Sequence, residues 1–187
     1  MDDRSEIARA AAEAAARRSY GKLVAYLAAR TRDVAGAEDA LAEAFAAALE
    51  RWPRDGVPER PGAWLLAVAR RRDVDAVRRR LTGEAARDHL RLIAEEAEAR
   101  MTNEELPDER LRLMFACAHP AIEPGVRAPL MLQAVLGFDA ATIASAFLVS
   151  PTAMGQRLVR AKSRIREAGI PFRVPERVEL GDRLDAV

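Results

Sequence analysis

The segment DAATIASAFLVSPTAMGQRLVRAKSRIR, residues 139–166, has the pattern of a short apolar helix, a tight turn and a second helix rich in cations. Asp139 is predicted to cap the start of this pair of helices. The turn is predicted at residues 148–151, where Ser150 suits the N-cap and Pro151 the first helical position. This order is typical of a helix-turn-helix motif. The inward-facing residues predicted for the first helix are Ile143, Ala144 and Phe147.

The second helix of this segment is predicted to have two distinct faces. Its apolar residues recur at spacings of three and four, which indicates a buried stripe. Glutamine and arginine near the start of such a helix can reach base edges, whereas later cations suit phosphates. A charged helix that ends a bundle would look similar, but the preceding turn favours DNA. The predicted buried stripe is Met154, Leu158, Ala161 and Ile165, and the predicted exposed face is Thr152, Gln156, Arg157, Arg160, Lys162, Arg164 and Arg166.

A second informative stretch, RPGAWLLAVARRRDVDAVRRR at residues 60–80, predicts an amphipathic helix from residue 63 to 80. Residues 70–80 hold six arginines against two aspartates, so ion pairs within the helix cannot neutralise all of the arginines. The prolines and glycines of residues 53–62 predict a loop before it. Surplus arginine beside such a loop fits single-stranded or melted nucleic acid, and the loop could hold a flipped base. The residues predicted to be buried are Trp64, Leu65, Val68, Val74 and Val77.

Composition supports an all-helical chain. Half of the 187 residues are hydrophobic but only 5% are aromatic, and alanine is abundant. The net charge is +1, yet residues 81–110 hold nine acids against four arginines. We therefore expect an all-α fold of two small helical domains joined by an acidic linker, residues 81–107.

The remaining apolar pattern predicts further helices. One helix is expected over residues 6–31, and a second begins after Asp33. A later apolar set spans residues 111–136 and is interrupted at 119–125, and Gly137 ends its second helix. Residues 170–175 are expected to be extended, and residues 180–187 to begin another helix. The core stripe predicted for the helix after Asp33 is Leu41, Phe45, Leu49 and Trp52.

Several classes of protein are disfavoured by the sequence. The charged N-terminus lacks the apolar stretch of a signal peptide, and no uncharged run is long enough to span a membrane. Cys117 is the single cysteine, and with His119 it supplies only two soft ligands, so a zinc site is not expected. There is no phosphate loop, dinucleotide fingerprint or catalytic triad pattern, so we expect neither an enzyme nor a cofactor. A cytoplasmic protein is the plain expectation.

The chain resembles sigma factors of the sigma-70 family, in the extracytoplasmic-function (ECF) class that keeps only two essential domains. Residues 37–45 (AEDALAEAF) are similar to the helix that docks on the polymerase clamp. Residues 64–69 (WLLAVA), with Asp75 and the arginines, resemble the helix that melts and reads the −10 element. Residues 108–168 resemble the domain that binds the −35 element, so the resemblance covers nearly all of residues 6–170.

The resemblance implies a role for each segment. Residues 1–80 would bind core polymerase and the −10 element, 81–107 would form the linker, 108–170 would bind the −35 element, and 171–187 would be a tail. Three acids would face the β′ clamp helices: Glu38, Asp39 and Glu43. The implied −10 residues are Arg54, Arg60, Trp64, Arg70, Arg71, Arg72, Arg78 and Arg79. The implied −35 residues are Ser150, Thr152, Gln156, Arg157, Arg160, Lys162 and Arg164.

The same resemblance implies the partners, which are promoter DNA and core RNA polymerase through its β′ clamp helices and β flap. Residues 168–187 are similar to the junction in a subgroup that continues into a helical C-terminal extension, and this sequence stops where that extension would begin. Control by an anti-sigma factor or by such an extension is therefore expected.

Two other functions stay open at this point. A stand-alone helix-turn-helix regulator would explain residues 139–168 but would leave residues 64–80 without a role. A helical protein-interaction module would use its cations to bind an acidic partner or RNA, with weak binding that depends steeply on salt.

Overall fold

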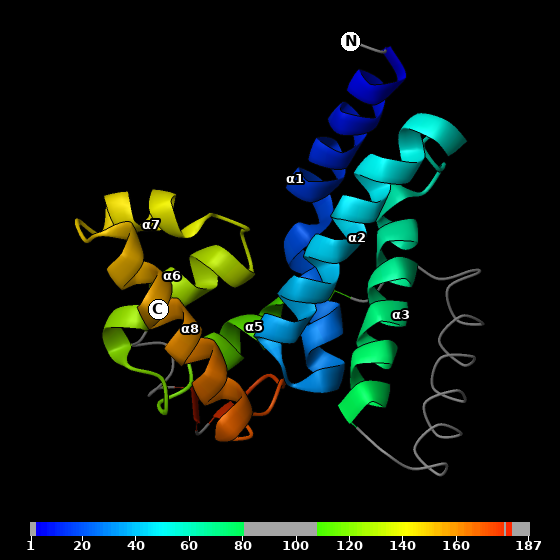
Figure 1. The fold of residues 1–187 in the computed structure, drawn as a ribbon. Helices are drawn as coiled ribbons and strands as arrows, with labels where there is room; N and C mark the ends of the chain where they lie inside the picture. The colour runs from blue at the N-terminus through cyan, green and yellow to red at the C-terminus, as the bar shows by residue number, and fades with distance from the viewer. Residues whose placement is uncertain (1–2, 81–107, 178, 181–187) are drawn as a thin grey trace. The chain divides into compact units, whose positions relative to one another are not determined.

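The computed structural model describes residues 3–80, 108–177, 179 and 180, and it describes the side chains of all of these except residues 72–80. Within these ranges the regular elements are α-helices, which confirms the all-α prediction (Figure 1). In chain order they are α1 (Asp3–Thr31), α2 (Val34–Asp55), α3 (Pro61–Arg80), α5 (Arg110–Cys117), α6 (Pro124–Ala134), α7 (Ala140–Ala146) and α8 (Pro151–Glu167).

The described residues form two compact units. The first contains residues 3–18 and 39–80, and the second contains residues 19–38 and 108–180. The division therefore passes through α1 and through the first turns of α2. The C-terminal half of α1 and the start of α2 belong to the same unit as α5 to α8.

The first unit is built on small side chains. Helices α1 and α2 bury alanine at helical spacing, and α3 buries Ala69. Small residues let helix backbones approach closely. At one end, Trp52 of α2 meets Trp64 of α3 edge to face, with ring centroids 5.5 Å apart. This geometry suits the ring quadrupoles. The other buried residues of the unit include Ala8, Ala12 and Ala15 from α1, Ala40, Leu41, Ala44 and Ala48 from α2, and Leu65, Leu66 and Ala69 from α3.

Three predictions for α2 and α3 were wrong in detail. The loop predicted from residue 53 begins only at Gly56, because α2 tolerates Pro53 in its last turn, where few backbone bonds remain to be lost. Leu49 is exposed, since the buried stripe passes through Ala48 instead. Trp64 and Val68 are half-buried, and the buried side chains among residues 61–71 of α3 are Leu65, Leu66 and Ala69. The side chains of Val74 and Val77 lie outside the described ranges.

The second unit has a core of branched side chains. Its most buried members come from α5, α6, α7, α8 and the turns between them: Leu113, Ile122, Leu130, Ile143, Met154, Leu158, Ile165 and Ile170. Arg127 of α6 is also buried, and its Nε donates to the carbonyl oxygen of Ile122 at 2.9 Å. A second bond reaches the carbonyl of Pro120 at 3.3 Å. The guanidinium thereby satisfies backbone acceptors in the turn between α5 and α6.

Two apolar predictions for this unit also need correction. Phe147 is 41% exposed, because it lies one residue beyond the end of α7 and its backbone is no longer helical. The stripe of residues 111–136 is core only in its middle, since Leu111 and Leu136 at its two ends are exposed.

The remaining segments agree with the sequence or lie outside the described residues. Residues 171–176 lie outside any helix, in line with the extended prediction. The acidic linker, residues 81–107, and the helix predicted over residues 181–187 fall outside the described ranges. Among the described residues, no helix is long and apolar enough to cross a membrane.

Candidate nucleic-acid interface

Helices α7 and α8 are both capped as the sequence predicted. The Asp139 carboxylate accepts from the backbone N–H groups of Ala141 and Thr142, each at 2.9 Å, and from the Thr142 hydroxyl at 2.7 Å. These bonds, that of the hydroxyl first, hold the pKa of Asp139 below its ordinary value. Ser150 Oγ accepts from the Ala153 N–H at 3.2 Å, with Pro151 at the first helical position. The two helix starts are therefore set by local side-chain chemistry.

The connection between α7 and α8 contains a backbone conformation that side chains rarely adopt. Leu148 has φ of 54° and is 93% exposed. A left-handed conformation costs about 1 kcal/mol or more for a residue that carries a Cβ. Its N–H still finds the carbonyl of Ser145 at 3.3 Å, and the next N–H, that of Val149, bonds to Ala144 at 3.0 Å. The strained residue thus reverses the chain between the helices while the backbone groups stay paired.

Helix α8 separates its apolar and cationic residues as predicted, with one exception. Met154, Leu158, Ala161 and Ile165 are buried. Gln156, Arg157, Arg160 and Arg164 are exposed, and so are Ser150 and Thr152 at the N-terminal end. An exposed polar face that begins at a helix N-terminus and continues as arginines has the form required for contact with a nucleic acid.

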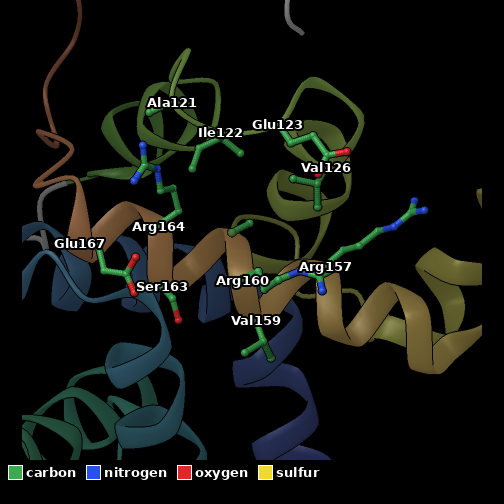
Figure 2. Close-up of a pocket in the computed structure, with 11 residues that line it drawn as sticks. Ala121, Ile122, Glu123, Val126, Arg157, Val159, Arg160, Ser163, Arg164 and Glu167 are labelled. Atoms are coloured by element: carbon green, nitrogen blue, oxygen red, sulfur yellow. The ribbon is translucent and has the colours of Figure 1, made fainter.

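Three of these arginines border an open cavity of about 570 Å³. Arg157, Arg160 and Arg164 line one side, and Ile122 and Glu123 line the other. Figure 2 shows the Arg164 side chain rising from α8 toward Ile122. Arg157, Arg160 and Arg164 therefore lie along one side of α8.

Lys162 is the exception, because it is buried and not on the exposed face. Its ammonium donates to Glu38 Oε2 at 2.5 Å and to Gln133 Oε1 at 2.9 Å. The physical reason is helix geometry: Lys162 follows Leu158 by four residues and precedes Ile165 by three, so it shares their face. A cation on a buried face needs an anionic partner, and Glu38 supplies one.

The three predicted polymerase-binding acids of α2 do not share one environment. Asp39 and Glu43 are exposed and belong to the first unit. Glu38 belongs to the second unit, and its side chain is only 14% exposed. The start of α2 is fixed by Asp33, whose Oδ1 accepts from the Gly36 N–H at 3.0 Å. Glu38 is therefore not part of the exposed acidic surface in this structure.

The predicted −10 residues gather around α3 and the loop before it, within the first unit. Arg54 pairs with Glu50 four residues earlier at 3.2 Å, on the exposed side of α2. Arg60 and Arg71 are exposed, and Trp64 and Arg70 are half-buried. Arg72, Arg78 and Arg79 lie on the α3 backbone, and their side chains are outside the described ranges.

Cys117 is buried, and His119 bonds to the backbone of the turn after α5. Burial raises the pKa of the Cys117 thiol to about 12, and nearby Glu38 adds to the effect. The thiol is thus protonated at neutral pH and a poor metal ligand. His119 Nδ1 accepts from the Ala121 N–H at 3.1 Å. No group of three metal-ligating side chains occurs among the residues that the structure describes.

Sequence reasoning missed three residues that shape the second unit: Gly21, Arg127 and Gln133. A Cβ added to Gly21 would overlap the carbonyl oxygen of Val135, and a glycine inside a predicted helix is the signal for such a close backbone approach. The sequence contains no comparable signal for Arg127, because a buried arginine depends on carbonyl groups that only the folded turn brings together. The same holds for Gln133 beside Lys162.

Comparison with known proteins adds the family. Residues 16–82 match the family model of Sigma-70 region 2. An uncharacterized protein of Rhizobium meliloti (strain 1021) is 39% identical over 175 residues, which are 90% of this chain and 40% of the relative. The chain thus spans well under half the length of the curated relative that it matches. No solved structure matches it. Residues 16–82, which include the acids of α2 and the arginines of α3, are therefore similar to region 2 of the sigma-70 family of RNA polymerase sigma factors.

Proposed function

We propose that this protein is a promoter-specificity subunit of bacterial RNA polymerase, of the ECF class, and that it acts in the cytoplasm where the polymerase is. The observation that carries the proposal is the region 2 match over residues 16–82. The exposed polar face of α8, outside that match, supports a second DNA-binding part. The chain spans 40% of the length of its relative, so the function is proposed for the residues of this sequence and not for the whole length of the relative.

The proposed role of α8 is to read duplex −35 DNA. Gln156 and Arg157 lie within its first two turns and are exposed, so they would face base edges in the major groove. Arg160 and Arg164 follow on the same side and would neutralise phosphates. Ser150 and Thr152 at the helix start would bond to the backbone of the DNA.

The proposed role of α3 and the loop of residues 56–60 is to capture the unpaired −10 strand. The arginines of α3 would bind the phosphates of the single strand. Trp64 is half-buried against Trp52, so its ring is held rigidly while one part stays accessible for stacking. The residues assigned to this role are Arg54, Arg60, Trp64, Arg70, Arg71, Arg72, Arg78 and Arg79.

The proposed role of α2 is to bind the basic clamp helices of the β′ subunit through Asp39 and Glu43. The double variant Asp39→Arg, Glu43→Arg tests it in a pull-down with core polymerase. The matched control is Glu6→Arg, Glu13→Arg, which reverses two exposed acids of α1 and changes the net charge equally. Binding that the first variant loses and the control keeps supports the proposal. Equal loss of polymerase binding in both double variants would mean that the effect comes from the net charge and not from Asp39 and Glu43.

A DNA experiment separates this proposal from a stand-alone helix-turn-helix regulator. Random duplexes are selected once with the protein alone and once with its complex with core polymerase. The sigma proposal expects a −35-like sequence only with polymerase, and Arg157→Ala should weaken binding by about 1–3 kcal/mol. Arg112→Ala, an exposed arginine paired with Glu109, is the control. A palindromic site bound without polymerase would favour the regulator.

Control of the protein is proposed to come from outside the two helical parts. An anti-sigma factor, or a C-terminal extension of the kind that the tail resembles, would cover the polymerase and DNA surfaces. The β flap of the polymerase is the proposed partner of the second unit in the assembled enzyme. Copurification of the full-length protein from cells, with and without polymerase, tests which partner is bound.

A further inference from the structure

Helix α8 carries a row of four uncharged residues on its solvent side. The row consists of Thr152, Gln156, Val159 and Ser163. They follow one another at spacings of four, three and four residues, so they share one face of the helix. Each precedes a residue of the buried stripe by two positions, which is about 200° around the helix axis. Figure 2 shows Val159 and Ser163 extending from the same side of α8. The row therefore faces away from the core of the second unit.

Val159 is the apolar member of this row, and it is 61% exposed. A single exposed apolar residue is common on protein surfaces and carries no meaning by itself. Valine is nevertheless a poor choice for an exposed helical position, because its branched Cβ restricts the side chain and alanine, lysine or glutamate favours the helix more. What distinguishes Val159 is its place, between Gln156 and Arg160 on the face that is proposed to meet DNA.

Val159 is also near enough to the start of α8 to enter a major groove. It is eight residues after Pro151, where the helix begins, which is about 12 Å along the helix axis. The major groove of B-DNA is about 12 Å wide and admits an α-helix. Arg160 and Arg164 directly follow Val159 and Ser163, and both line the adjacent open cavity. Phosphates bound by these arginines would hold the uncharged row against the base edges.

The chemistry of the major groove selects the base that suits Val159. A valine side chain has no hydrogen-bonding group, so it can distinguish bases only by apolar contact. Thymine is the base that presents an apolar group in this groove, its C5 methyl. We propose that Val159 contacts a thymine methyl group, and that α8 thereby selects an A·T pair at one position of its site. The inference rests on the proposed function, because it concerns the duplex that α8 would read.

Replacement of thymine by deoxyuridine tests the contact, because it removes the methyl group and keeps the hydrogen-bonding groups of the base. The duplex is the one selected by the complex of the protein with core polymerase, and each thymine of its −35 segment, on both strands, is replaced in turn. At one position the replacement should weaken binding by the wild-type complex about fourfold, as expected when one methyl group leaves an apolar contact. No effect at any position, or a selected segment without A·T pairs, would overturn the proposal.

The variant Val159→Ala shows whether Val159 is the residue that senses the methyl group. It should fold normally, since alanine favours an exposed helix more than valine does. It should bind the thymine duplex about fourfold more weakly and should no longer respond to deoxyuridine at that position. Val174→Ala is the matched control, because it truncates another exposed valine that lies outside α8. This control should keep the wild-type affinity and the full deoxyuridine effect.

The same titrations separate the failure of this inference from the failure of the proposed function. A scrambled duplex measures whether the complex prefers its selected −35 sequence at all. If that preference is present and Val159→Ala keeps the full deoxyuridine effect, α8 reads DNA through other residues, and only the thymine contact is refuted. If neither the wild type nor Val159→Ala distinguishes the selected duplex from the scrambled one, the −35 function itself fails, and the thymine contact fails with it.

Discussion

The substitution Lys162→Met should be the most destabilising single change among the charged residues of α8. It removes the ammonium that lies 2.5 Å from Glu38 Oε2 and keeps most of the side-chain volume. The carboxylate of Glu38 is then left in a site where only 14% of its side chain meets solvent. The loss of the ammonium partner of a carboxylate in such a place is strongly unfavourable.

The expected magnitude follows from burial. Removing one partner of a buried ion pair costs about 3–5 kcal/mol. We expect a cost at the lower limit, near 3 kcal/mol, because both side chains keep some exposure to solvent and the amide of Gln133 lies beside the pair. With a urea m-value of about 2 kcal/mol/M, the midpoint of unfolding falls by roughly 1.5 M. Glu38→Leu combined with Lys162→Met should cost much less than the sum of the single changes, with a coupling energy of about 2 kcal/mol.

Arg166→Met is the matched control, because it removes a cation one turn later on the same helix. Arg166 is 53% exposed and lies 3.4 Å from Asp33, so its loss should cost less than about 1 kcal/mol. Urea unfolding followed by far-UV circular dichroism gives the stabilities, and amide exchange in α8 gives the local effect. If Lys162→Met costs no more than Arg166→Met, or if the double-variant cycle is additive, the ion pair does not hold the helices together.

Three local features of α7 and α8 give further predictions. Leu148→Gly should be more stable than Leu148→Ala by about 1 kcal/mol, measured by thermal unfolding, because only glycine relieves the left-handed backbone and the lost side chain is exposed. Ser150→Ala should cost about 1 kcal/mol in urea unfolding and Ser150→Asp should restore it, since either a hydroxyl or a carboxylate can cap α8. The lowered pKa of Asp139 means that its contribution is complete above the ordinary value of 3.8 and is lost as the pH falls through the folded-state pKa. The melting temperature of Asp139→Asn should therefore fall less between about pH 5 and pH 2.5 than that of the wild type, and parallel curves would contradict this.

Features that depend on neighbours in sequence could be predicted from the sequence. The caps at Asp139 and Ser150 were found because an N-cap bonds to N–H groups two or three residues later. The turn at Gly137 was found for a similar reason, since its φ of 77° suits glycine best. The continuation of α2 through Pro53 was missed because the proline was interpreted as the start of a loop. A proline in the last turn of a helix removes little hydrogen bonding, so the helix can continue through it.

The burial of Glu38 and Lys162 was missed, although a signal for it was present. Glu38 follows Val34 by four residues and precedes Leu41 by three, and both of these apolar residues are fully buried. Lys162 has the same relation to Leu158 and Ile165. One charged residue on a buried face is easily taken for a break in the pattern. Two such residues of opposite charge, one in each of two helices, would together have predicted a buried ion pair. Glu38 and Lys162 are 124 residues apart, however, so the sequence alone does not indicate that they meet.

An ionic contact between residues 19–38 and α8 has a consequence that an apolar contact would not have. If the pair of Glu38 and Lys162 were replaced by leucine and methionine, the contact would be about as stable or more so, yet its opening would expose apolar surface to water. When the ionic pair opens, both residues are well solvated, and each is then available to a partner of opposite charge. An ion pair at this position therefore makes the contact less costly to open than an apolar pair would.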